Sequence, residues 1–194
     1  MKAKFLAPVA LVLAVAGCGG KASFTVGGAI SGLTYPGLVL TNNGDRITVP
    51  AGATSYSFPK SIEYGDEYTI VIEKDPDHQT CGAANGPSTL KGAAGYTETI
   101  SVPIVCIIKT YNLSGTVSGL TAAGLVVANG NGSEYAVAKD ATTFAYPDNI
   151  ASQTTYGLAV ITQPAGLTCT ITNGTGKMGD ANVTNVAIAC KPNA

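Results

Sequence analysis

The chain contains five cysteines and a single histidine, and these side chains carry most of the chemistry that it could perform. Thiols form disulfides or bind zinc, and an imidazole acts as a base or a metal ligand. A zinc site is not supported, because the sequence has no Cys-x-x-Cys pair and no second histidine to complete four ligands. Disulfide formation is therefore the favoured interpretation for the four thiols that follow the N-terminal region, Cys81, Cys106, Cys169 and Cys190.

The histidine lies in the segment Asp75-Pro76-Asp77-His78-Gln79, where two carboxylates lie near the imidazole in the sequence. Such a group can bind a cation or tune a base. The corresponding segment nearer the C-terminus, residues 163–167, has none of these side chains, so we expect a charged turn exposed to water. A hydrolase would also need a nucleophile at a recognisable spacing, and no Gly-x-Ser-x-Gly elbow is present. No catalytic residue is predicted.

A glycine-rich segment, Gly174-Thr175-Gly176-Lys177-Met178-Gly179, satisfies the spacing of the dinucleotide-binding fingerprint. That fingerprint requires a helix immediately afterwards, because the helix N-terminus holds the phosphate. Here residues 183–189 alternate in the manner of a β-strand. The segment is therefore predicted to be a loop between two strands, and no cofactor is expected.

Two clusters of asparagine and glycine are possible binding loops, formed by Asn42, Asn43 and Asp45 and by Asn129 and Asn131. Oxygen-rich loops of this kind can bind calcium, which prefers several carboxylates. Asp45 is the only acid in the first cluster and the second has none, so tight hairpin turns explain the clusters better. No metal site is predicted.

The N-terminus has the pattern of an export signal. A short cationic start precedes a 12-residue apolar run, Phe5 to Ala16, which is too short to span a membrane as a helix. The run is followed by Val15-Ala16-Gly17-Cys18, which resembles the lipobox of bacterial lipoproteins. The resemblance implies a signal peptide over residues 1–17, lipid attachment at Cys18 and a short tether over residues 18–23. Because Gly19 and not aspartate follows the modified cysteine, the sorting pattern of Gram-negative lipoproteins points to the outer membrane.

The remainder of the chain is a tandem duplication of one β-rich unit. Repeat 1 covers residues 24–108 and repeat 2 covers residues 109–194. Residues 24–33 recur as residues 111–120, and the apolar run of residues 37–40 recurs as residues 124–127, each followed by an Asn/Gly turn. Alternating apolar and polar residues with regular turn signals predict about seven short strands in each copy, as in a β-sandwich. The fold class is therefore all-β, with two tandem sandwiches.

The duplication also selects one of the three pairings that four cysteines allow. Cys81 and Cys106 occupy the same places in repeat 1 as Cys169 and Cys190 in repeat 2, so each copy should be closed by its own disulfide. Loops of this length contribute about 3 kcal/mol each to stability in the chain-entropy account. An exported protein meets the oxidising conditions in which such bonds persist.

Taken together, these features resemble the tandem Ig-like repeats of bacterial surface lipoproteins. The resemblance is carried by the Ser-Gly-Leu and Gly-Leu-Val openings, the aromatic–proline element and the valine-rich last strand that ends in cysteine, over nearly all of residues 24–190. It implies a fold and a location, and no particular activity. The net charge of −1, from 11 basic and 12 acidic residues, gives no electrostatic reason to expect nucleic acid as a partner.

The sequence thus predicts a non-enzymatic lipoprotein of the outer membrane that serves as an interaction or spacer module of the cell envelope. Its expected partners are the membrane, through the N-terminal lipid, and an unidentified envelope protein or glycan. A glycan- or peptide-binding surface module is the alternative, for which the tyrosines present in only one copy, Tyr35, Tyr64 and Tyr96, could supply an aromatic platform. A hydrolase built around His78 is the least favoured interpretation.

Overall fold

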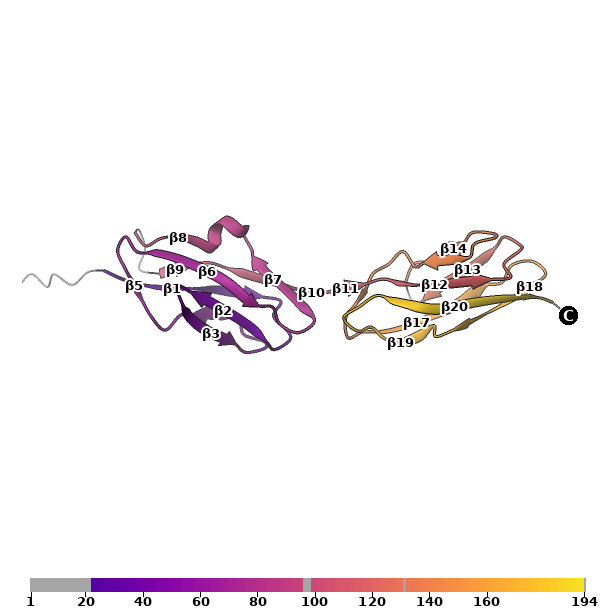
Figure 1. Cartoon of the computed structure of the whole chain (residues 1–194), viewed down its shortest axis with the longest axis horizontal. Helices are drawn as coiled ribbons and strands as arrows, with labels where there is room; N and C mark the ends of the chain where they lie inside the picture. The colour runs from indigo at the N-terminus through magenta and orange to yellow at the C-terminus, as the bar shows by residue number, and fades with distance from the viewer. Residues whose placement is uncertain (1–21, 96–98, 131, 194) are drawn as a thin grey trace, which may run out of the picture.

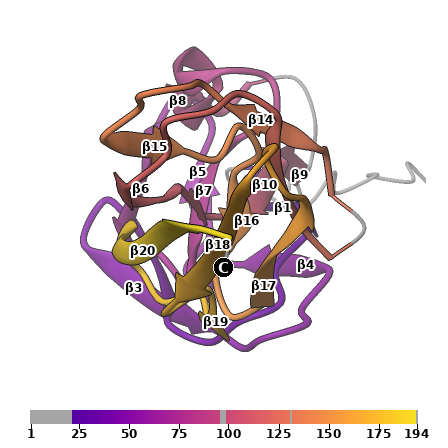
Figure 2. The same cartoon turned by 90° about the vertical axis from the view of Figure 1, so that its right-hand side faces the viewer.

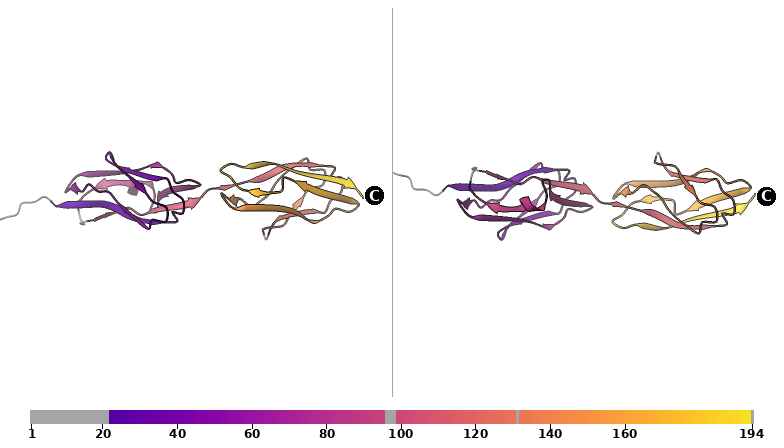
Figure 3. Two further views of the ribbon diagram at one scale, coloured as in Figure 1. Left: turned by 90° about the horizontal axis from the view of Figure 1, so that it is seen from below. Right: turned by 90° about the horizontal axis from the view of Figure 1, so that it is seen from above.

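The computed structural model describes residues 22–95, 99–130 and 132–193, and it shows two β-sandwiches joined end to end (Figure 1). Two further views, from below and from above, show the same extended arrangement (Figure 3). Viewed along the long axis, repeat 2 lies in front of repeat 1 (Figure 2). The described residues form strands and one 3-10 helix, η1 (Pro87–Leu90), which confirms the predicted all-β class. Within this part of the chain, no helix is long and apolar enough to cross a lipid bilayer.

Repeat 1 places two sheets face to face. The first sheet has the order β4-β1-β10-β7, with β5 and β9 also paired to β1, and the second has the order β3-β2-β6-β8. The strands are β1 (Ser23–Ser31), β2 (Leu38–Asn42), β3 (Asp45–Val49), β4 (Ser55–Ser57), β5 (Ile62–Glu63), β6 (Glu67–Lys74), β7 (Gln79–Ala83), β8 (Lys91–Ala93), β9 (Thr99–Ser101) and β10 (Ile104–Ile108).

Repeat 2 has the same plan. Its sheets run β15-β12-β20-β18 and β14-β13-β17-β19, and a short pair joins β11 to β16. The strands are β11 (Thr110–Tyr111), β12 (Leu113–Ser118), β13 (Leu125–Asn129), β14 (Tyr135–Val137), β15 (Thr143–Ala145), β16 (Ile150–Ala151), β17 (Thr155–Thr162), β18 (Leu167–Thr172), β19 (Thr175–Lys177) and β20 (Val183–Pro192).

The strands described in each repeat are shorter and more numerous than the seven predicted. The reason is that β1 changes partners along its length: it pairs with β5 at its start, with β4 and β9 in the middle, and with β10 at its end. Sequence alternation identifies a strand but does not reveal such a change of partner. One residue, Lys109, separates the last strand of repeat 1 from the first strand of repeat 2.

In each repeat the first long strand, β1 or β12, runs parallel to the strand or strands that end the repeat. Strand β1 pairs in parallel with β9 and β10, and β12 pairs in parallel with β20. Glycine on the first strand makes this close approach possible. A Cβ atom added at Gly28 would lie 2.2 Å from the carbonyl oxygen of Val102, and one added at Gly115 would lie 1.7 Å from that of Val186.

Each sandwich encloses its own apolar core, because the inward-facing residues of both sheets alternate with exposed polar ones. The core of repeat 1 contains Val26, Leu38, Leu40, Phe58, Ile70, Val102 and Ile104 among its buried residues. The core of repeat 2 contains Leu113, Leu125, Val127, Tyr146, Leu158, Met178, Val186 and Ile188 among its buried residues. The disulfide cysteines belong to these cores, so each cross-link is part of the packed interior.

Candidate functional site

Both predicted disulfides are present. Cys81 on β7 lies directly opposite Cys106 on β10, and Cys169 on β18 lies directly opposite Cys190 on β20. Each bond therefore ties the last strand of a repeat to the neighbouring strand of the same sheet. The repeat-based pairing is confirmed.

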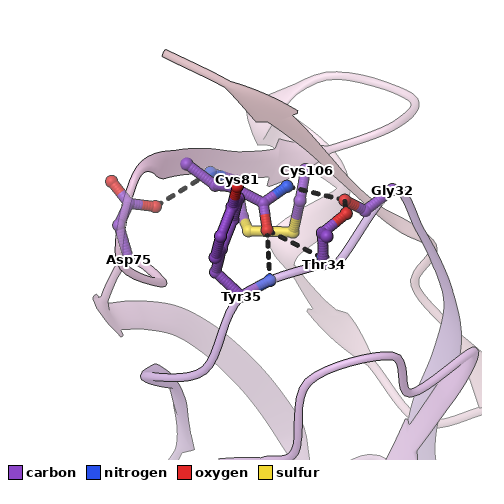
Figure 4. Close-up of a disulfide and its surroundings, with 7 residues drawn as sticks. Gly32, Thr34, Tyr35, Asp75, Cys81 and Cys106 are labelled. Carbon is purple, nitrogen blue, oxygen red and sulfur yellow. Dashed lines mark hydrogen bonds between the residues drawn. A yellow bond between two sulfur atoms is a disulfide. The ribbon is translucent and has the colours of Figure 1, made fainter. Parts of the chain in front are cut away.

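A partly buried polar network surrounds the disulfide of repeat 1 (Figure 4). Asp75 Oδ1 accepts a hydrogen bond from the Cys81 N–H at 2.8 Å. Gln79, which is 0% exposed, accepts from the N–H groups of Thr34 and Tyr35 through Oε1, at 2.8 and 2.9 Å. Its Nε2 donates to the Gly32 carbonyl oxygen at 2.6 Å. Gln79 thus fixes the loop between β1 and β2, which carries Tyr35.

The two repeats are joined by backbone hydrogen bonds at the connecting residue. The Lys109 N–H donates to the His78 carbonyl oxygen at 2.9 Å, and the Ser152 N–H donates to the Lys109 carbonyl oxygen at 2.8 Å. Lys109 is therefore bonded to a turn of repeat 1 on one side and to a turn of repeat 2 on the other. This double attachment leaves the connector little freedom.

Five side chains gather beside that connector, and we call them the joint cluster: Tyr35 and His78 from repeat 1, and Ser152, Gln153 and Asp180 from repeat 2. His78 Nδ1 lies 2.9 and 2.8 Å from the two carboxylate oxygens of Asp180. Ser152 is 1% exposed, and its hydroxyl donates a hydrogen bond to Asp180 Oδ1 at 2.7 Å. Gln153 Nε2 lies 3.4 Å from His78 Nδ1, and the Tyr35 ring meets the imidazole edge-on at 5.0 Å.

The expectation that His78 is a fully solvated turn residue is wrong. Its side chain is 25% exposed and is held against Asp180, a residue 102 positions away in the sequence. The backbone at His78 has a φ of 61°, in the left-handed region. The hydrogen bond from His78, followed by that from Ser152, lowers the pKa of the Asp180 carboxyl group.

The joint cluster contains serine, histidine and aspartate, but it does not have the geometry of a catalytic triad. In a triad the aspartate and the serine use different nitrogens of the imidazole. Here Asp180 and Ser152 both face Nδ1, at 2.8 and 3.4 Å, and the serine hydroxyl donates to the carboxylate. The serine is therefore not activated as a nucleophile. The hydrolase interpretation loses its structural basis at His78.

Two surface cavities lie away from the joint cluster. One of about 420 Å³ is lined by residues 67–69 and 91–93 of repeat 1, and one of about 390 Å³ by residues 117–121 and 140–142 of repeat 2. Among the described residues, no three His, Cys, Asp or Glu side chains come together in a way that could hold a metal ion. The Gly174–Gly179 segment contains β19 and leads into β20, so no helix follows it.

The described residues predicted as possible binding loops, Asn42, Asn43, Asp45 and Asn129, lie in or next to hairpin turns. Asn42 is buried, and its Oδ1 accepts from the Thr69 N–H at 3.0 Å. Asn129 Oδ1 accepts from the Gly157 N–H at 2.7 Å, the equivalent bond in repeat 2. Both asparagines thus fasten their hairpins to the neighbouring strand, an internal role that leaves little of either side chain for a ligand.

The remaining loop positions differ in what they offer to a partner. Asn43 and Asp45 are on the outside of the first hairpin, where Asn43 Nδ2 donates to the Glu67 carbonyl oxygen at 2.6 Å. Cys18, the predicted lipidation site, and Asn131 lie outside the described residues, as does Tyr96. Of the other two unshared tyrosines, Tyr35 is in the joint cluster, whereas Tyr64 is 67% exposed at the opposite end of repeat 1. These two rings do not form a common platform.

Comparison with known proteins gives a fold and no family. No protein-family model and no curated protein matches the sequence. Among solved structures, the TIE protein of Bacillus anthracis is similar over 88% of this chain, with a TM-score of 0.57 and 12% identity, and the match spans 34% of that protein. The shaft pilin SpaA of Lactobacillus rhamnosus GG aligns over 90% of this chain and 99% of its own, with a TM-score of 0.29 and 12% identity. The major pilin T-13 of Streptococcus pyogenes aligns over 90% and 98%, with a TM-score of 0.30 and 10% identity.

The similarity to the first of these structures supports the all-β sandwich fold that the sequence predicted. The joint cluster, in contrast, was not predicted. The only sequence signal for it was that its residues are present in one copy of the duplication and absent from the other.

Proposed function

We propose that this protein is a lipid-anchored rod of the bacterial outer membrane that acts as a non-enzymatic interaction or spacer module of the cell envelope. The observation that carries the proposal is the joint between the repeats. The single connecting residue is hydrogen-bonded to both repeats, and a side-chain cluster spans the junction. These contacts favour a stiff unit over two domains that move independently. A stiff unit suits a protein that holds a contact surface at a fixed distance from its anchor.

The anchor in this proposal is Cys18. Four residues, 19–22, separate it from the start of β1 at Ser23, and an extended chain spans at most about 3.6 Å per residue. Repeat 1 would therefore stay within about 20 Å of the lipid surface. Stable anchoring needs more than one acyl chain, because each buried methylene contributes only about 0.8 kcal/mol. Acylation of both the thiol and the new amino terminus would meet that need.

Two substitutions test the anchor separately from the fold. With Cys18→Ala, we expect loss of incorporated labelled palmitate and of the mature membrane-bound form. With Gly19→Asp, palmitate labelling should persist while the protein moves from the outer to the inner membrane fraction. Unchanged membrane association and size of the Cys18→Ala protein would contradict lipid anchoring.

The partner is tested by isolating native envelope complexes with a tagged chain. A stoichiometric protein recovered from wild-type cells supports an interaction module, and retention on envelope glycan with no protein partner supports the glycan-binding alternative. A partner lost when Asn43 and Asp45 are both changed to alanine would assign the outer face of the first hairpin as the contact surface. The same substitutions at Asn173 and Asp148, which lie on other turns, are the matched control.

A further inference from the structure

The ends of the two repeats that face away from the joint show which features are particular to the joint. At the distal end of repeat 2, the Asn193 N–H donates to the Gly166 carbonyl oxygen at 3.0 Å, which repeats the bond from Lys109 to His78. At the proximal end of repeat 1, the Tyr64 N–H donates to the Ala22 carbonyl oxygen at 3.2 Å, which repeats the bond from Ser152 to Lys109. The backbone connections of the joint are thus common to both copies.

The side chains of the joint cluster are not repeated. The position of Tyr35 is Ala122 in repeat 2, and the position of His78 is Gly166. In the other direction, Ser152 and Gln153 correspond to Tyr64 and Gly65 in repeat 1. Each copy therefore carries the polar side chains only at the end that faces the other copy, which indicates a role in the contact itself.

The strength of that contact depends on whether the imidazole of His78 is protonated. An imidazolium donates from both nitrogens and is attracted by a carboxylate, whereas a neutral imidazole offers one donor and no charge. His78 Nδ1 meets both oxygens of Asp180, so the protonated ring gains the most from closing the joint. Histidine side chains exchange this proton between about pH 5 and pH 8.

The other charged groups near the joint do not compete with the interaction between His78 and Asp180. Lys109 lowers the pKa of Asp180, as His78 does. In the turn of His78, the Asp75 carboxylate accepts from the Cys81 N–H, and Asp77 lies 3.8 Å from Lys74 Nζ. Tyr35 contributes a ring edge.

We propose that the joint is a pH-dependent latch, in which protonation of His78 tightens the contact between the repeats and loss of that proton loosens it. The interaction needs an ionised Asp180 as well. The pKa of this carboxyl is lowered, mainly by the His78 hydrogen bond, so its contribution is present above the ordinary carboxyl value of about 3.9 and is lost as the pH falls through the lowered value. The latch is thus closed in mildly acidic solution and opens toward alkaline pH, and it does not depend on the lipid anchor.

The test measures how the two repeats move relative to one another. Residual dipolar couplings of backbone N–H groups are recorded for the mature chain with Cys18→Ser, at about pH 5.5 and about pH 8, on either side of the histidine range. In a stiff rod one alignment tensor fits both repeats, whereas a loose joint gives each repeat a tensor of different magnitude. We expect one common tensor at the lower pH and a measurable divergence at the higher pH.

Three variants decide whether His78 and Asp180 are the cause. In Asp180→Asn and in His78→Gln the tensors should diverge at both pH values, with the pH dependence lost. Asp140→Asn makes the same chemical change on an exposed turn at the far end of repeat 2 and should behave as the wild type. The amide spectrum of each repeat shows whether a variant is folded. A wild-type tensor ratio that is the same at both pH values, or a pH dependence that survives in Asp180→Asn, would overturn the latch.

Discussion

Gln79 offers a sharp test of how repeat 1 is held together, because repeat 2 has an apolar residue, Leu167, at the same position. The substitution Gln79→Leu keeps the volume close to that of the native side chain but removes three hydrogen bonds. It leaves the N–H groups of Thr34 and Tyr35 and the carbonyl oxygen of Gly32 without this partner.

The size of the effect follows from the burial of those groups. A fully buried polar group that loses its partner costs about 1 to 3 kcal/mol. The three hydrogen bonds are only partly buried, so water can reach some of the backbone atoms, and the low end of that range applies. We therefore expect the free energy of unfolding of repeat 1 to fall by about 3 kcal/mol, with no change in repeat 2.

The measurement is denaturant unfolding of the mature chain, followed by amide signals assigned to each repeat so that two transitions can be separated. Leu167→Ala is the control, and it should lower the stability of repeat 2 alone by about 2 to 5 kcal/mol through the cavity that it leaves. A change of less than about 0.5 kcal/mol for Gln79→Leu would be within the range of ordinary surface substitutions. It would refute the idea that this side chain organises the loop of Tyr35.

Three further outcomes are expected. Gly115→Ala should destabilise repeat 2 by about 3 kcal/mol or more, because the new Cβ would meet the backbone of the parallel last strand. Thermal unfolding measures this loss, and a loss below about 1 kcal/mol would contradict the close approach of the two strands. Replacing Cys81 and Cys106 together by alanine should cost repeat 1 about 3.5 kcal/mol, measured against the reduced and oxidised wild type, and an equal stability of all three would oppose it. Burial, and then the charge of Tyr68, raises the pKa of Tyr56. The contribution of Tyr56 to stability is therefore full below about pH 10 and is lost as the pH rises further. Spectrophotometric titration should show one tyrosine that ionises only when the protein unfolds, and Tyr56→Phe should remove this ionisation step.

Local patterns were sufficient for the architecture. The alternation of apolar residues predicted the strands, the Asn/Gly turns predicted the hairpins, and the position of each cysteine within a copy predicted its partner. These features follow from short-range rules that act within one repeat. The duplication strengthened them because each rule could be checked twice.

The joint could not be derived in the same way. His78 and Asp180 are 102 positions apart, and no periodicity links a turn of one sandwich to a loop of the next. Comparison of the copies also worked against the prediction, because a residue without a counterpart was interpreted as having no role. In a duplicated protein, side chains found in only one copy at the facing ends are the ones that can specialise for the contact between copies.

The parallel pairing of first and last strands has a mechanical consequence. When tension is applied to the two ends of a repeat, strands such as β12 and β20 are pulled in opposite directions along their length, so all the hydrogen bonds between them are loaded together in shear. In this geometry the hydrogen bonds cannot break one at a time, as they do when a hairpin is pulled apart from one end. The cross-link between Cys169 and Cys190 also withholds the intervening residues 170–189 from extension. The fold is therefore built to bear load along its axis.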